Sequence, residues 1–132
     1  MTYWLAVLAY VLPTFPLGYF WHLKTFAPAY ARLEIYRPDV IIPMGLSSMV
    51  LQGLFFAWAY PKLFSTASDQ WLSSALQFWV IFGLLAWSFL VLPVAAKVRM
   101  TDVRRFMVLE TGFTAIQFAI AGVLLALVYR GT

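Results

Sequence analysis

Long uncharged stretches alternate with short charged segments along this chain of 132 residues. A helix needs about 20 residues to cross the hydrocarbon core of a bilayer, which is roughly 30 Å thick. Each uncharged stretch reaches about that length. The pattern therefore predicts four transmembrane helices, near residues 3–21, 41–61, 71–94 and 106–129.

The apolar stretches are continuous rather than alternating in polarity, and this argues against the other fold that a bilayer permits. A membrane-spanning β-barrel requires strands of roughly ten residues in which apolar and polar positions alternate. We therefore predict an all-α fold. Residues 1–132 are expected to form a single domain, a polytopic membrane protein built as a four-helix transmembrane bundle.

The composition agrees with a membrane location and removes several function classes. Hydrophobic residues make up 64% of the chain and charged residues 11%, against about 25% charged in an ordinary soluble domain. The lack of cysteine excludes disulfides, thiol nucleophiles and cysteine-bound metals. The single histidine, His22, excludes a bis-histidine haem site and an HExxH motif. No metal site is expected, no nucleotide-binding motif is present, and the sequence identifies no cofactor.

The chain has a net charge of +4, and the distribution of its basic residues along the sequence is typical of membrane topology. Seven of the nine Lys and Arg side chains lie in the connections at residues 22–40 and 95–105, and only Lys62 and Arg130 lie on the other side. The positive-inside rule predicts cytoplasmic locations for these two loops and places both termini outside. No cation precedes the first apolar stretch, so we expect a retained helix rather than a cleaved signal peptide. We expect the lipid bilayer as a partner. We do not expect the protein to bind nucleic acid.

The first connection contains a segment, residues 27–36, for which a short interfacial helix and an irregular loop are both open. Pro28 would stand in the first turn of such a helix, where proline is tolerated. Tyr30, Leu33 and either Tyr36 or Arg37 would share one face, because of their helical spacing.

Polar side chains inside the predicted spans mark the places where chemistry can occur, because each costs free energy that must be offset. Glu110, Thr114 and Gln117 follow helical spacing on the fourth span, and Ser48 and Gln52 do so on the second. The two glutamines lie near the middle of their spans, within reach of one another across a helix interface.

Glu110 is the only acidic residue inside a predicted span, and it lies about one turn from the cytoplasmic boundary. His22 ends the first span at a similar height. The candidates for ligand binding or proton handling are therefore six side chains: Glu110, His22, Gln52, Gln117, Thr114 and Ser48. The last four are expected mainly to join helices, through hydrogen bonds of about 0.5–2 kcal/mol each.

Three functions are open. The first is a non-enzymatic membrane protein that binds a partner membrane subunit, a second copy of itself or a small apolar ligand. Aromatic residues make up 19% of the chain and suit an apolar or flat ligand such as a quinone, a sterol-like molecule or a tetrapyrrole. The alternatives are a small proton-coupled transporter protomer that uses Glu110, and a lipid-embedded acid–base enzyme that uses Glu110 and His22.

Two stretches carry a resemblance to known proteins: FPLGYFWH at residues 15–22 and QGLFFAWAYP at residues 52–61. With them, the chain resembles small uncharacterised four-span inner-membrane proteins of bacteria. The resemblance implies a bacterial inner membrane and assigns neither a reaction nor a site residue. The chain is also similar in size to small multidrug exporters, but those carry an essential carboxylate in the first span, where this chain has none.

The distribution of basic residues makes the topology testable. A single cysteine introduced at Ser68 should react with a membrane-impermeant maleimide in intact cells, whereas one at Thr101 should react only after the cells are opened, because the two positions lie on different sides of the third span. The cysteine-free parent protein is the control. Labelling of both positions from one side would contradict the four-span topology.

Overall fold

The computed structural model describes all 132 residues and consists of helices and connecting loops. Four helical segments are long and apolar enough to span a membrane: Thr2–Thr25, Ile42–Leu63, Trp71–Lys97 and Val103–Tyr129. The predicted all-α four-helix bundle is therefore confirmed, and the chain is a multi-pass membrane protein. At the end of the first and third segments and the start of the fourth, the helices run three or four residues beyond the predicted bounds, and the other ends agree within two residues.

Two of the four spans contain a π-helical turn, and the first connection contains a short helix. The elements in chain order are α1 (Thr2–Phe20), the π-helix η1 (Trp21–Thr25), α2 (Ala27–Leu33), α3 (Ile42–Leu63), α4 (Trp71–Ala86), the π-helix η2 (Trp87–Val91), α5 (Leu92–Lys97) and α6 (Val103–Tyr129). For residues 27–36 the sequence allowed either a short helix or an irregular loop, and the structure contains a helix there, α2, with Pro28 in its first turn. The helix ends at Leu33, and the capping residue that follows, Glu34, has a φ of 59° in the left-handed region.

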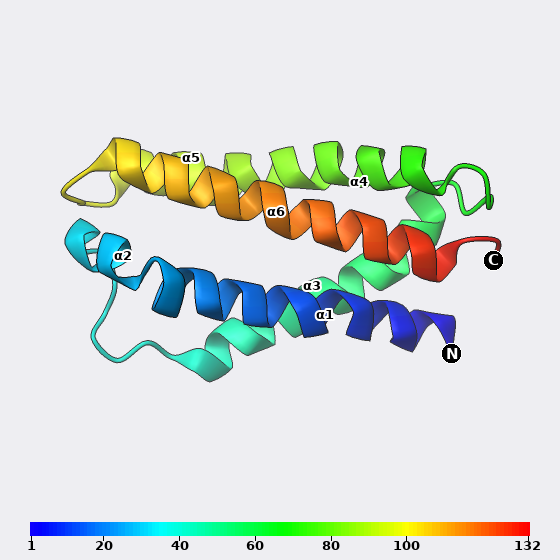
Figure 1. Ribbon diagram of the computed structural model, residues 1–132, viewed down its shortest axis with the longest axis horizontal. Coiled ribbons are helices and arrows are strands. Elements are labelled where there is room, and N and C mark those ends of the chain that lie inside the picture. Colours follow the sequence, from blue (N-terminus) through cyan, green and yellow to red (C-terminus); the bar gives the residue numbers. More distant parts are fainter.

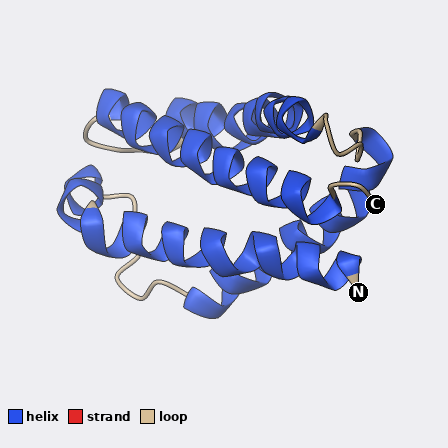
Figure 2. Cartoon of the chain, turned by 45° about the vertical axis from the view of Figure 1, so that its right-hand side comes forward, coloured by secondary structure: helices blue, strands red, loops and turns tan.

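The four spans form two layers (Figure 1). The helices α4 and α6 lie side by side in one layer, and α1 and α3 form the other, with α3 crossing α1 obliquely. Because α6 packs against both α1 and α4, it is the central helix of the bundle. Figure 2 shows the same arrangement after a 45° turn. Both termini lie at one end, and α2 and the α5–α6 connection lie at the opposite end, which we call the α2 end.

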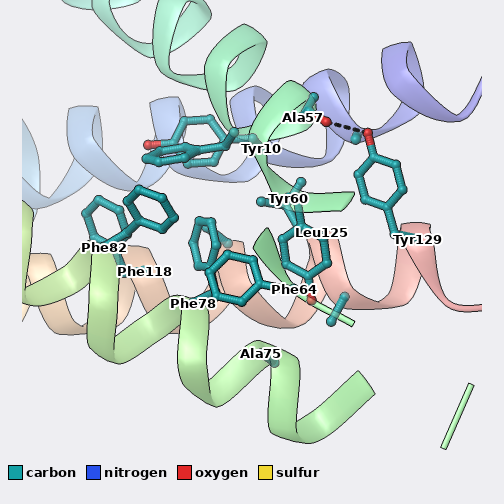
Figure 3. Packing of buried hydrophobic residues seen from close by; sticks show 14 of the residues in the cluster. Tyr10, Ala57, Tyr60, Phe64, Ala75, Phe78, Phe82, Phe118, Leu125 and Tyr129 are labelled. Atoms are coloured by element: carbon teal, nitrogen blue, oxygen red, sulfur yellow. Dashed lines mark hydrogen bonds between the residues drawn. The ribbon is translucent and has the colours of Figure 1, made fainter. Parts of the chain in front are cut away.

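Aromatic side chains fill the larger of two buried clusters, in which α1, α3, α4 and α6 meet (Figure 3). The ring of Phe56 lies 5.2 Å from that of Phe78 and 5.0 Å from that of Phe82, so α3 and α4 meet through interlocking rings. The hydroxyl of Tyr129 donates a hydrogen bond to the carbonyl oxygen of Ala57 at 2.6 Å, which ties α6 to α3.

Glycines allow two helix pairs to approach closely. A methyl group on Gly122 would lie 2.8 Å from the carbonyl oxygen of Ala75, so α6 and α4 could not keep their present distance with a larger residue. A methyl group on Gly53 would lie 2.9 Å from a side-chain carbon of Val11, which sets the crossing of α3 over α1. Such contacts are a main source of helix association in a bilayer, where water drives no burial.

The helix α3 packs along its C-terminal half only. Residues 43–48 are exposed, whereas Gly53, Phe56 and Ala57 are buried. Because α3 is held against α1 at Gly53 and crosses it obliquely, its N-terminal half diverges from α1 towards the α2 end (Figure 1).

Candidate functional site

A hydrogen-bonded cluster joins three segments at the α2 end. Nε2 of His22, in η1, lies 2.8 Å from Oε1 of Glu110, on α6. The hydroxyl of Tyr30, on α2, donates to the same carboxylate oxygen at 2.5 Å. The side chains of His22 and Glu110 are only 19% and 18% exposed. The sequence placed these two residues at similar heights, and the structure brings them into direct contact.

The geometry of His22 determines how protons are arranged in this cluster. Nδ1 lies 2.8 Å from the carbonyl oxygen of Gly18, which can only accept, so Nδ1 carries a hydrogen. Nε2 then either donates to an ionised Glu110 or accepts a hydrogen from a protonated one. In both cases one proton lies between Nε2 and Oε1, and the pair has no net charge.

The π-helical turn η1 holds His22 in this position. It follows α1 directly and replaces the α-helical hydrogen-bond pattern from Trp21 to Thr25. Turns of this kind inside a helix are frequent at functional sites, because the wider turn changes the direction of the side chains that it carries. Here Trp21 uses its indole N–H to donate to the hydroxyl of Tyr30 at 3.2 Å, so the same turn supports both partners of Glu110.

Aromatic rings surround the cluster. Tyr36 stacks on Tyr30 with ring centres 5.2 Å apart, and Phe113 meets the His22 imidazole edge-on at 4.5 Å. Desolvation of their hydroxyl groups, reinforced by the nearby charge of Glu110, raises the pKa of both Tyr30 and Tyr36. Both phenols therefore remain protonated hydrogen-bond donors at neutral pH.

A cavity of about 650 Å³ lies beside His22, between the second half of α1, the loop before α3 and the diverging half of α3. Its volume falls in the range of roughly 300–1,000 Å³ that is usual for small-molecule sites. Most of its wall is apolar, and Phe113 contributes from α6. The side chains with polar groups in the wall are Tyr19, His22, Tyr36, Arg37 and Ser48. None of the lining residues is an aspartate or a glutamate.

A second polar network lies near the middle of the membrane-spanning region. The hydroxyl of Tyr10, on α1, donates to Oε1 of Gln52 at 2.5 Å and accepts from Nε2 of Gln117 at 2.9 Å. Gln52 also donates to the hydroxyl of Ser48 at 2.9 Å. The sequence predicted that the two glutamines could reach one another, but Tyr10 stands between them and bridges α3 to α6.

Thr114 belongs to neither network. It lies on α6 between Glu110 and Gln117, as the helical spacing predicted, but it lines a separate hollow of about 410 Å³ between α4 and α6. In that hollow the indole N–H of Trp79 donates to the carbonyl oxygen of Ala115 at 2.9 Å, and that of Trp87 donates to Thr111 at the same distance. Thr114 is 9% exposed and therefore contributes to helix packing.

Sequence reasoning missed Tyr10 and Tyr30 as members of these networks. For Tyr30, the spacing with Leu33 identified a shared face, and both residues are in fact buried. Tyr10 gave no such signal, because a tyrosine within an apolar run looks the same whether its hydroxyl meets a partner or not. Helical spacing predicted Tyr36 or Arg37 on the face with Tyr30 and Leu33; in the structure α2 ends at Leu33, and both residues line the cavity from the loop that follows.

The chemistry available at the α2 end is that of a neutral, proton-sharing pair beside an apolar cavity. Three metal-ligating side chains converge nowhere in the structure. Comparison of the chain with protein-family models, with curated proteins and with solved structures finds no match. The fold and the site together define the class of the protein: a multi-pass, four-helix membrane protein with a His–Glu pair in the wall of a cavity.

The contact between His22 and Glu110 predicts thermodynamic coupling. In a double-mutant cycle, His22→Ala and Glu110→Ala should each destabilise the protein, but their combined loss should be smaller than the sum by about 1–3 kcal/mol, because each single change leaves a half-buried polar partner unpaired. Thermal or denaturant unfolding in detergent measures this. Thr114→Ala paired with His22→Ala is the control and should be additive. Additive losses for His22 and Glu110 would show that the contact contributes nothing.

Proposed function

We propose that this protein is a non-enzymatic membrane protein that binds a small, predominantly apolar ligand in the cavity beside His22. The observation that carries the proposal is the cavity itself, with its volume of about 650 Å³ and its largely apolar wall. A ligand there would remove apolar surface from contact with water or headgroups, which is the usual source of affinity in such sites. A partner subunit would need a continuous surface on this protein that is complementary to its own. A hollow of this volume suits a small molecule instead.

The divergence of α3 explains why this site is open rather than filled by side chains. A methyl group on Gly45 would meet no atom within 4 Å. Met44, a lining residue, is 67% exposed and lacks a protein neighbour to bury it. A ligand that covered both positions would complete the packing between α1 and α3.

We also propose that the protein lies in a bacterial inner membrane with both termini outside. The support is the charge distribution, since residues 22–40 and 95–105 hold seven of the nine basic side chains. These two connections lie at the same end of the bundle (Figure 1), as a single cytoplasmic side requires. In this orientation the cavity opens near the cytoplasmic face.

A bulky side chain at Gly45 tests the binding function. Gly45→Phe should occupy the open space in the cavity and remove most of the labelling by a hexadecanol analogue that carries a photoreactive diazirine in mid-chain. The purified protein is irradiated in detergent, and the labelled fraction and labelled peptide are read by mass spectrometry.

The neighbouring substitution Leu46→Phe is the matched control. Leu46 is exposed on the same turn of α3 but lies outside the cavity wall, so its labelling should match that of the parent protein. Equal melting temperatures of the two variants would exclude a general loss of fold. Unchanged labelling of Gly45→Phe, or labelling that maps away from α1 and α3, would contradict binding in the cavity.

Proton-coupled transport is a second candidate function, and the hydrogen bond between His22 and Glu110 is the observation that favours it. A ligand that settles against His22 would change the environment of a group that holds an exchangeable proton. The acid–base enzyme is less favoured, because both ring nitrogens of His22 are engaged within the protein.

Proton release distinguishes the coupled function from simple binding. Addition of the hexadecanol analogue to the detergent-solubilised protein in weakly buffered solution should release protons if binding and protonation are coupled, and Glu110→Gln should abolish the release while the protein still folds. A pH-sensitive dye provides the measurement. Binding without any pH change would remove the support for proton coupling.

A further inference from the structure

We propose that the ligand of this cavity is a long-chain carboxylate, held by its chain along α1 and α3 and by its head group at Arg37. This inference rests on the proposed binding function and adds the chemical class of the ligand. It depends on two features of the wall: which hydrogen-bonding roles are unused, and which charges are present.

Three hydroxyl groups of the wall have a hydrogen that no protein acceptor uses. The hydroxyl groups of Tyr19 and Tyr36 donate to no protein acceptor, and the hydroxyl of Ser48 accepts from Gln52 and keeps its own hydrogen free. Both nitrogens of His22 are already engaged. The protein therefore offers hydroxyl donors that a head group rich in acceptor oxygens can use, and Arg37, which can only donate, decides between an acceptor and a donor head group.

Arg37 supplies the charge that selects an anion. Its Nε and Nη2 donate to Asp39 at 3.0 and 3.3 Å, which leaves Nη1 free to bind an oxygen of a head group. Lys24 lies 5.8 Å from the ring centre of the lining residue Tyr19 and adds a second cation near the cavity. Arg37 is the only lysine, arginine, aspartate or glutamate among the lining residues, so a full charge reaches the wall at this position alone.

The apolar part of the wall is positioned to hold the chain of the same molecule. Phe15, Met49 and Phe113 line the cavity from α1, α3 and α6, whereas Arg37 lines it from the loop. A carboxylate head at the loop and a hydrocarbon chain along the helices would therefore match the distribution of charge and apolar surface. A neutral alcohol would use the chain contacts and forgo the cation.

The experiment compares two probes that differ only in the head group. Palmitic acid and hexadecanol, each carrying a diazirine in mid-chain, are crosslinked to the detergent-solubilised protein at alkaline pH, where the acid is ionised. We expect the acid to label the cavity peptides about threefold more efficiently, which corresponds to the energy of a partly exposed ion pair.

Two substitutions should shift this preference in opposite directions. Arg37→Gln should lower labelling by the acid about threefold and leave labelling by the alcohol unchanged. Asp39→Asn should raise labelling by the acid, because it frees the remaining donors of Arg37 and removes a negative charge. Arg32→Gln is the matched control, since it makes the same charge change on an exposed residue outside the wall and should alter neither probe.

The outcomes separate this inference from the binding function. If Gly45→Phe removes labelling by both probes but the parent protein labels equally with acid and alcohol, the cavity binds apolar molecules and the carboxylate assignment is wrong. If Gly45→Phe removes neither, the binding function itself fails. If unlabelled phosphatidylglycerol suppresses acid labelling more strongly than unlabelled palmitic acid does, the head group recognised is a lipid phosphate, which also overturns the carboxylate.

Discussion

One carboxylate oxygen, Oε1 of Glu110, connects the segments that form the α2 end of the bundle. It lies within hydrogen-bond distance of His22 in η1 and of Tyr30 on α2, so the central helix α6 holds both the end of the first span and the connection that follows it. An isolated ionised carboxylate would be costly at this depth. The contact with His22 offsets that cost, because the pair can carry one proton and no net charge wherever that proton lies.

The position of this pair depends on helix packing elsewhere in the molecule. Gly53 brings α3 against α1 in the half near the termini, and Gly122 brings α6 against α4. With α3 fixed at that crossing, its N-terminal half diverges and leaves the cavity at the opposite end. Close packing in one half of the bundle and open space in the other therefore follow from the same crossing, and the open space borders the His–Glu pair.

The apolar stretches were sufficient to predict the four helices, because a bilayer accepts few alternatives to a continuous apolar helix of about 20 residues. Helical spacing also predicted that Glu110, Thr114 and Gln117 share one face of α6. It did not predict which side chain on a neighbouring helix each of them would contact. Those neighbours depend on rotations and crossing angles set by glycine contacts between helices. This is why Tyr10 stands between the two glutamines and Thr114 faces a different hollow.

The residues that line the cavity could not be predicted from the sequence, for a related physical reason. Its wall combines residues from α1, α3 and α6 with Tyr36 and Arg37 from an irregular loop, and no single periodicity links them. Once they are assembled, their chemistry is consistent: apolar side chains along the helices, unused hydroxyl donors, and an arginine with donors to spare. Arg37 is the only lysine, arginine, aspartate or glutamate in this wall, and Glu110 is not part of it. The contact with His22 that allows Glu110 to lie within the bundle thus also keeps its carboxylate out of the cavity wall, where Arg37 stands.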